Sequence, residues 1–297
     1  MKPAAFEYIA PDSLEQALSV LREHGDDAKV LAGGQSLVPA MNFRMLQPTL
    51  LVDLNKLDEL DYIRQNEDGD LLVGAMTRHR RLEFDSLVAQ NAPLLHESIP
   101  SIAHPQIRNR GTLGGSLAHA DPAAELPVIA LAVDAQIKVQ SNAGERTIPA
   151  VEFFQGMFMT EIKPDEILVE VAIPASSART GWAFKEIARR SGDYAMMGVA
   201  VLITLDEDGI CKKARLVYLN AGDGPVDAVE AAKTLEGQAR DDQAFEAAAE
   251  KASQDEIDPL GNMHADVDYQ RHLAYVLTLR ALDLAYQRAD DDHGENR

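Results

Sequence analysis

The sequence contains a single cysteine, Cys211. One thiol cannot form a disulfide within the chain. It also cannot supply a cysteine-type zinc site or an iron–sulfur cluster, which needs about four ligands. We expect Cys211 to be a small buried hydrophobic residue in a strand. We also expect no metal ligands on this chain.

Long apolar runs are lacking as well. No stretch approaches the roughly 20 residues of a membrane-spanning helix. The N-terminal residues include Lys2, Glu7 and Asp12 and lack the apolar run of about 7–15 residues found in signal peptides. We expect a soluble, cytoplasmic protein without a membrane span.

Positive charge is scarce compared with negative charge. The chain has 28 Lys and Arg against 48 Asp and Glu, a formal net charge of −20. Nucleic acids and anionic membranes bind basic surfaces, so we expect neither as a partner. The length of 297 residues and the 46% apolar fraction indicate a globular protein of two or three domains.

Two glycine-rich stretches are the most informative features that are present. The first reads Ala32-Gly-Gly-Gln-Ser-Leu37, and the second reads Thr112-Leu-Gly-Gly-Ser116 and continues to His119, Asp121 and Glu125. Adjacent glycines let another group approach the backbone closely. Consecutive N–H groups in such loops form a concavity that binds phosphate. The two loops are therefore predicted to converge and to hold one diphosphate.

The N-terminal half predicts alternating strands and helices. Ser13 and Gln16 form a capping-box pattern before a helix that Gly25 ends. A helix could also begin at Pro39. Thr77 could cap a short helix with a basic cluster, Arg78, His79, Arg80 and Arg81, that could meet phosphate but is expected to form a solvated face. Other segments in this half are expected to be strands (4–10, 29–32, 50–54, 70–76, 164–173), a hairpin (135–148) or apolar helices (93–102, 128–133).

The small and polar stretch 174–181 is the best domain boundary. Beyond it the pattern predicts three antiparallel strands (182–188, 196–205, 212–219) and three helices (226–235, 241–253, 269–287). We expect domains at 1–177, with subdomains 1–57 and 58–177, and at 178–290. The charged tail 291–297 is predicted to be disordered.

A strand followed by a glycine loop also occurs in nicotinamide-binding folds. Those folds use the spacing G-x-G-x-x-G at the start of a helix. Gly33 and Gly34 are adjacent instead, as are Gly114 and Gly115. The spacing disfavours that class.

The paired glycine loops, with Arg108-Asn-Arg-Gly leading into the second, resemble the FAD-binding subunit of molybdenum hydroxylases. That family includes the medium subunit of carbon monoxide dehydrogenase and the flavin domain of xanthine dehydrogenase. The resemblance implies an α+β fold: an FAD-binding domain of two α/β subdomains (PCMH/vanillyl-alcohol-oxidase-like), followed by a three-stranded antiparallel sheet with a three-helix bundle.

The resemblance also implies an oxidoreductase subunit that binds FAD and passes electrons to an external acceptor. The molybdenum–pterin cofactor and the [2Fe–2S] clusters would be held by a large and a small partner subunit, in a dimer of heterotrimers. No catalytic side chain is expected on this chain. The residues implied as FAD contacts are Ala32, Gly33, Gly34, Gln35, Ser36, Leu37, Thr112, Gly114, Gly115, Ser116, His119, Asp121, Glu125, Leu168, Lys185 and Tyr194.

The implied roles differ among these residues. The two loops would bind the diphosphate through backbone N–H and hydroxyl groups, and Glu125 would bond sugar or ribityl hydroxyls. Lys185 and Tyr194 would lie near the isoalloxazine ring, His119 would lie along the cofactor, and Leu168 would offer main-chain contacts. Gln35 stands where other members carry His, so its backbone is the firmer contact.

Simpler interpretations stay open for single residues. Glu125 suits a helix N-terminus, His119 a core position, Lys185 an exposed strand and Tyr194 a domain seam. A stand-alone flavin oxidase or dehydrogenase of the same fold, or a scaffold that has lost flavin, are the alternatives for the whole chain.

Overall fold

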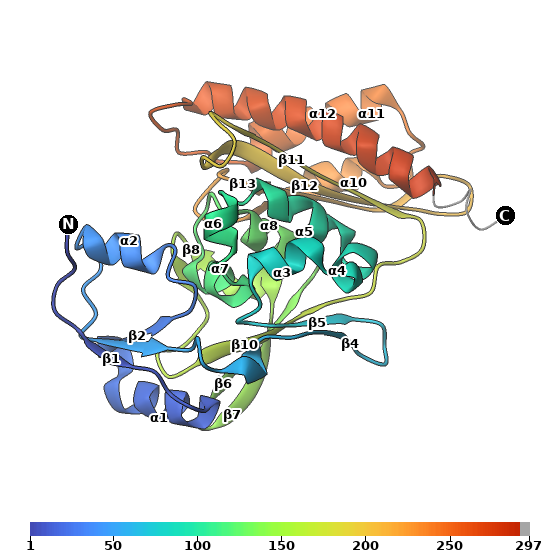
Figure 1. Ribbon diagram of the computed structural model, residues 1–297. Helices are drawn as coiled ribbons and strands as arrows, with labels where there is room; N and C mark the ends of the chain where they lie inside the picture. The colour runs from blue at the N-terminus through green and yellow to red at the C-terminus, as the bar shows by residue number, and fades with distance from the viewer. Residues whose placement is uncertain (292–297) are drawn as a thin grey trace.

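The computed structural model describes residues 1–291 of the chain. The tail that we predicted to be disordered lies, from residue 292 on, outside the described residues. The elements form three layers: an N-terminal subdomain, a central sheet with its helices, and a C-terminal sheet covered by helices (Figure 1).

The N-terminal subdomain is a small parallel sheet with one long helix. The Ser13 hydroxyl caps this helix by accepting from the Gln16 N–H at 3.2 Å, and Gly25 ends it at φ 52°, both as predicted. The Gln16 side chain accepts from the Asp12 N–H rather than from that of Ser13, so only half of the capping box forms. The elements, in sheet order β1-β3-β2, are β1 (Glu7–Ile9), β3 (Leu50–Asp53), β2 (Ala28–Leu31), with α1 (Leu14–His24), η1 (Gly25–Asp27) and α2 (Leu37–Asn42).

Helix α2 begins two residues earlier than predicted. Pro39 lies in its first turn, where backbone N–H groups have no acceptor within the helix, so the missing N–H of proline costs nothing there.

The central sheet is antiparallel and carries the predicted hairpin at Ser141–Gly144. Its central strand β10 contains a bulge between Leu168 and Glu170. The strands, in order, are β4 (Ile63–Gln65), β5 (Leu71–Gly74), β10 (Ile167–Ile173), β6 (Gln136–Ser141) and β7 (Gly144–Pro149); β8 (Phe154–Gly156) and β9 (Met159–Thr160) form a separate hairpin.

Short helices lie between this sheet and the C-terminal sheet (Figure 1). One prediction among them is wrong: Arg78, not Thr77, is the N-cap of α3, and the Thr77 hydroxyl donates instead to the Tyr62 carbonyl at 3.0 Å. The helices are η2 (Asp58–Leu60), α3 (His79–Phe84), α4 (Ser86–Asn91), α5 (Pro93–Ser98), η3 (Ile99–Ser101), α6 (Pro105–Arg108), α7 (Leu113–His119), α8 (Glu125–Ala132) and α9 (Ala150–Phe153).

The C-terminal part forms the expected antiparallel sheet and three helices. The prediction of a helix from residue 226 is wrong at its start: Val226 and Asp227 form a two-residue fourth strand, β14, and the helix begins at Val229. Cys211 is 1% exposed in β13, which confirms its expected place in a strand. The elements are β11 (Thr180–Ala188), β12 (Ala195–Leu205), β13 (Cys211–Leu219), β14 (Val226–Asp227), α10 (Val229–Leu235), α11 (Asp242–Lys251), η4 (Ala252–Glu256) and α12 (Val267–Asp291).

The C-terminal sheet is buried on both faces. One face, which includes Ala183 and Val199, packs against α10, α11 and α12. The other, which includes Phe184 and Ala200, joins the hydrophobic core of the central layer. The two parts of the chain therefore share one continuous apolar core. None of the helices within residues 1–291 is long and apolar enough to cross a membrane.

Candidate functional site

The two glycine loops meet, as the sequence predicted. A Cβ atom built on Gly33 would overlap the carbonyl oxygen of Arg110 and would lie 2.8 Å from the Cα of Gly111, directly before the second loop. A Cβ on Gly115 would lie 3.4 Å from the Cβ of Ala32. Only glycine allows this approach, because any larger residue would push the two backbones apart.

The first loop presents a row of free donors. No described residue accepts a hydrogen bond from the backbone N–H groups of residues 33–37. Gly34 has φ 73°, the left-handed conformation that turns successive N–H groups toward one side. The Gln35 side chain folds back and donates to the Gly33 carbonyl at 2.9 Å, so this residue offers its backbone outward. The loop suits a phosphate group.

The second loop is built differently, and this corrects part of the expectation. The N–H groups of Leu113 and Gly114 donate to the carbonyls of Thr77 and Ala75, at 3.0 and 2.9 Å. The Gly115 N–H donates to the Thr112 hydroxyl, the N-cap of α7, at 3.0 Å. These donors are used within the protein. The second loop therefore offers its Ser116 hydroxyl and its close approach to the first loop, rather than a row of N–H groups.

Two residues outside the predicted set of FAD contacts connect the loops: Asn55, which the sequence did not single out, and Arg78, which it placed only in the basic cluster after Thr77. The Asn55 side chain donates to the Ala32 carbonyl at 2.8 Å. The Arg78 guanidinium donates to the Asn55 side-chain oxygen and to the Arg110 carbonyl. Arg78 thus bridges the two loops. For Asn55, the only signal in the sequence was its position directly after the predicted strand 50–54.

The buried His79 side chain hydrogen-bonds to the start of the second loop. Its Nε2 lies 2.9 Å from the Thr112 carbonyl, which can only accept, so Nε2 carries the proton. Burial, opposed only in part by this hydrogen bond, lowers the pKa of His79 to about 4. The ring is 5% exposed and neutral near pH 7. A Cβ on Gly111 would lie 2.8 Å from it, so the ring and the loop also fit closely.

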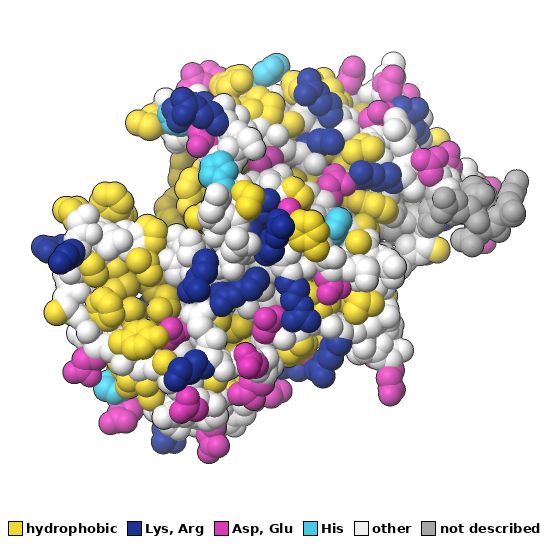
Figure 2. Space-filling model, in the orientation of Figure 1, with side chains coloured by type: hydrophobic (Ala, Val, Ile, Leu, Met, Phe, Trp, Pro, Cys, Tyr) yellow, Lys and Arg dark blue, Asp and Glu magenta, His cyan; other side chains and the backbone are white. Residues whose placement is uncertain are grey.

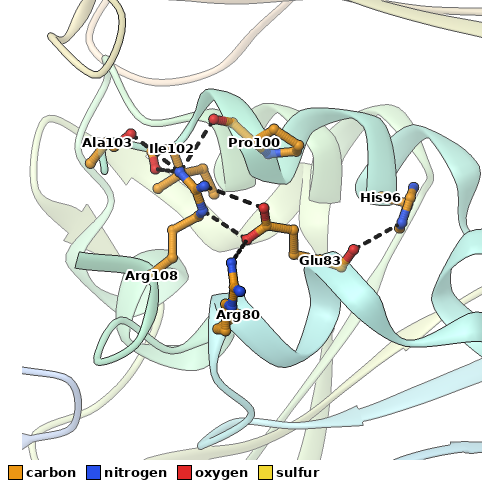
Figure 3. Close-up of polar contacts among 7 residues, drawn as sticks. All are labelled: Arg80, Glu83, His96, Pro100, Ile102, Ala103 and Arg108. Carbon is orange, nitrogen blue, oxygen red and sulfur yellow. Dashed lines mark hydrogen bonds and ion pairs between the residues drawn. The ribbon is translucent and has the colours of Figure 1, made fainter. Parts of the chain in front are cut away.

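A buried ion pair holds the segment that leads into the second loop (Figure 3). The Arg108 Nε and Nη2 donate to the two oxygens of the Glu83 carboxylate at 3.0 and 3.3 Å, and Nη1 donates to the carbonyls of Ile102 and Ala103 at 2.9 and 3.2 Å. Arg108 is 6% exposed. One guanidinium therefore ties α3, η3 and α6 together and fixes where Arg110 begins the glycine loop.

The basic cluster on α3 is mainly a solvated face, as expected. Arg80 and Arg81 are roughly half exposed and pair with Glu83 and Asp61. In the space-filling view, Lys and Arg side chains gather in the middle of the face over α3 and α6, although the chain is acidic overall (Figure 2). The same view shows a notch between the lobe that carries α2 and the layer that carries α12.

His119 ends α7 and faces an exposed hairpin. Its ring lies 5.0 Å from that of Phe158, centroid to centroid, and the Phe158 N–H donates to the Ala120 carbonyl at 3.0 Å. Burial lowers the pKa of His119, so the imidazole is neutral near pH 7. A neutral imidazole packed against a tilted aromatic ring suits a position along a cofactor.

Acidic residues gather where α7 passes into α8. Glu125 is the first residue of α8, and the Asp121 carboxylate accepts from the Ala123 N–H at 2.9 Å. Burial, and then the charge of Asp121, raise the pKa of Glu125 to about 7. Tyr194, which is 70% exposed, lies in the β11–β12 loop; burial, and then the charges of Asp121 and Glu125, raise the pKa of its hydroxyl. Three of the expected FAD contacts therefore come together here.

Two other expected contacts lie on strands. The Leu168 side chain is 5% exposed, and its main chain borders the bulge in β10. Along β11, side chains alternate between the two faces, which places Lys185 on the face of Ala183 and Glu186 on that of Phe184. Glu186 is an acidic residue at the seam that the sequence did not indicate.

The comparisons with known proteins agree with this geometry. Residues 4–176 match the family described as the FAD binding domain in molybdopterin dehydrogenase, and residues 182–285 match the CO dehydrogenase flavoprotein C-terminal domain. The chain belongs to this family of FAD-binding subunits.

Two relatives illustrate the similarity. The 6-hydroxypseudooxynicotine dehydrogenase complex subunit alpha of Paenarthrobacter nicotinovorans is 46% identical over 289 residues, covering 97% of each chain. The carbon monoxide dehydrogenase medium chain of Hydrogenophaga pseudoflava is 37% identical over 288 residues, covering 97% of this chain and 99% of the relative. A solved structure of carbon monoxide dehydrogenase from the same organism matches with a TM-score of 0.93 at 38% identity, covering 97% and 99%.

The residues present fit the cofactor of this family. FAD carries a diphosphate between two nucleoside-like halves, and the first loop offers consecutive N–H donors to such a group. The Gly33 and Gly115 approaches keep side chains out of the space between the loops. The predicted contacts Ala32–Leu37, Thr112–Ser116, His119, Asp121 and Glu125 lie on the two loops and the segments that follow them, and Tyr194 comes from the β11–β12 loop.

Proposed function

We propose that this chain is the FAD-binding electron-transfer subunit of a molybdenum-containing hydroxylase complex. It would receive electrons from [2Fe–2S] clusters on a partner chain and pass them through FAD to an external acceptor. The observation that supports this most directly is the contact between the two glycine loops, Gly33 against Arg110. The single buried cysteine agrees, because the chain cannot hold a cluster itself.

Each group of residues has a definite part in this proposal. The N–H groups of residues 33–37 and the hydroxyls of Ser36 and Ser116 bind the diphosphate. Glu125 accepts hydrogen bonds from cofactor hydroxyls, and the exposed ring of Tyr194 covers one end of the isoalloxazine. FAD, when bound, supplies redox chemistry that can take up two electrons and release them singly. The protein positions it and excludes water.

The assembly and location extend the same proposal. We propose a large molybdenum-cofactor subunit and a small [2Fe–2S] subunit as partners, in a cytoplasmic dimer of heterotrimers. Domains at 1–177 and 178–290 would bind FAD and complete the cover over it. The name of the Paenarthrobacter relative, a subunit of a dehydrogenase complex, supports an assembly of several chains.

Co-expression with the partner subunits tests the function. We expect a complex whose flavin absorbance bleaches on reduction and returns with an electron acceptor, with one FAD per copy of this chain. A complex that assembles but holds no FAD would contradict the proposal. Sustained turnover by this chain alone would favour a stand-alone flavin oxidase instead.

A further inference from the structure

Phe158 is an exposed aromatic residue in the two-residue turn between β8 and β9. Its side chain is 52% exposed, and its φ angle of 57° is in the left-handed region. Turns use glycine or asparagine at such a position, because a bulky side chain is strained there. The fold would be more stable with a smaller residue at this place, so the strain points to a role for the ring outside the fold itself.

The β8–β9 hairpin holds this ring in a fixed place. At the base of the hairpin, the fully buried Phe153 accepts a hydrogen bond at its carbonyl from the Glu161 N–H at 2.9 Å. At the tip, the Phe158 N–H donates to the carbonyl of Ala120, the C-cap of α7, at 3.0 Å. The hairpin also packs beside α7 (Figure 1). The position of the ring is therefore set by the helix that contains the second glycine loop.

Helix α7 connects the glycine loops to Phe158. A Cβ on Gly115 would lie 3.4 Å from the Cβ of Ala32, so this face of α7 is turned toward the first loop. His119 comes four residues after Gly115 and lies about one helical turn further along the same face. The ring of Phe158 lies 5.0 Å from that of His119, centroid to centroid, with 44° between the ring planes. Phe158 is thus the next group after His119 on the face that leads away from the two loops.

The residues after α7 indicate which half of FAD this face would meet. Asp121 directly follows the C-cap, and Asp121 and Glu125 both lie near the Tyr194 hydroxyl. In the proposed function, Tyr194 covers one end of the isoalloxazine. From the diphosphate at the loops, the path along α7 therefore leads toward the flavin half of the cofactor rather than toward its adenosine half.

We propose that Phe158 is a further contact for FAD, and that its ring, together with the His119 imidazole, packs against the flavin half. This inference rests on the proposed function. A flat aromatic ring gains free energy against another aromatic ring beyond the area that it buries. That gain exists only with the cofactor bound, and it then offsets the strain at Phe158.

The test compares FAD with ADP, which has the adenosine and the diphosphate but no flavin. The complex with its partner subunits is prepared without FAD for the wild type, F158A and F158Y. The dissociation constant of FAD is measured by flavin fluorescence, and the inhibition constant of ADP is measured by competition with FAD. The matched control is F84A, because Phe84 is 64% exposed at the end of α3.

We expect F158A to lose about fivefold in FAD affinity with no change in the inhibition constant of ADP. F158Y, which keeps the ring, and F84A should bind both molecules as the wild type does. Equal losses for FAD and ADP in F158A would overturn the proposal, because the contact would not be with the flavin half. Wild-type affinity for FAD in F158A would overturn it as well.

The variant F158G separates this role from a purely structural one. Glycine removes the strain of the left-handed conformation, so the full chain without FAD should melt at or above the wild-type temperature. Its FAD affinity should still fall as in F158A. A fall in both the melting temperature and the affinity would mean that Phe158 only supports the fold.

Two further outcomes have separate meanings. If F158A binds FAD normally but no longer assembles with the partner subunits, the exposed ring is a subunit contact and the proposal is overturned. If the wild-type complex itself binds no FAD, the proposed function fails. A wild-type complex that binds FAD beside an F158A complex that binds it equally well contradicts this inference alone.

Discussion

Gly33 lies against Arg110 so closely that a methyl group would not fit between them. A Cβ on Gly33 would overlap the Arg110 carbonyl oxygen and would lie 2.8 Å from the Gly111 Cα. Both contacts are to backbone, which cannot swing aside as a flexible side chain would. The same contact brings the two predicted phosphate-binding loops together.

The variant G33A should therefore separate the loops. Gly33 does not have a positive φ, so alanine adds the clash without adding backbone strain. We expect FAD affinity to fall at least about tenfold, or about 1.4 kcal/mol. The measurement is the FAD content of the purified complex by absorbance. The control is G224A, because a Cβ on Gly224 would meet no atom within 4 Å. Wild-type FAD content in G33A would contradict the role of this contact.

Asn55 should matter as much as the glycines, although it touches the cofactor site only through the loops. N55A removes the hydrogen bond to the Ala32 carbonyl and leaves the Arg78 guanidinium without one acceptor. Unpaired, partly buried polar groups of this kind cost about 1–3 kcal/mol. We expect a lower free energy of unfolding in urea together with reduced FAD content. N142A, in an exposed hairpin turn, serves as the control. If N55A matches N142A in both measurements, Asn55 does not hold the loops.

The Arg108–Glu83 pair should stabilise the fold only when both partners are present. Among the described residues, R108M leaves the largely buried Glu83 carboxylate with one ion-pair partner, the half-exposed Arg80 at 3.5 Å. Breaking a buried pair in this way costs about 3–5 kcal/mol. The double variant R108M/E83Q removes the unpaired charge, and we expect it to regain a large part of the loss. Urea unfolding of both variants and of R190M, an exposed arginine, decides the point. A double variant no more stable than R108M would show that the charge is not the cause.

Glu170 should contribute to the loss of folding stability at low pH. Burial alone would raise its pKa, but hydrogen bonds from Lys138, Tyr62 and Arg64 hold the pKa below the usual value. The folded-state pKa is therefore below the unfolded one. The stabilising contribution is present above about pH 4.3 and is lost as the pH falls through the folded-state pKa. E170Q should flatten the acid side of the melting-temperature profile and lower stability near pH 7. The control E145Q, in the exposed β6–β7 hairpin, should have the same melting-temperature profile as the wild type. If the melting temperature of E170Q falls as steeply in acid as that of the wild type, other carboxylates cause the loss of stability.

Elements with strong local signals could be predicted from the sequence, and those defined by distant contacts could not. Ser13 caps its own helix and Gly25 ends it, because both interactions lie within a few residues. Thr77 carries the same local signal, but its hydroxyl reaches the carbonyl of Tyr62, fifteen positions away in the chain, and the helix begins later. The short strand β14 forms only because β13 offers it an edge.

The candidate site also has features that the sequence predicts and features that it does not. The adjacent glycines Gly33–Gly34 and Gly114–Gly115 could be recognised in the sequence, because close backbone approach requires glycine wherever it occurs. The sequence could not show that two N–H groups of the second loop donate to the carbonyls of Ala75 and Thr77. These hydrogen bonds depend on where β5 ends relative to α7, which is a property of the packed chain.

The order of amino acids by itself determined the two loops, the single thiol that excludes a cluster, and most of the helices and strands, because each depends on groups that are close along the chain. Only the tertiary structure decided that Arg78 and Asn55 join the loops and that Tyr194, from the β11–β12 loop, lies near Asp121 and Glu125. Those contacts unite segments from different layers, and burial there sets charge states that no local pattern encodes.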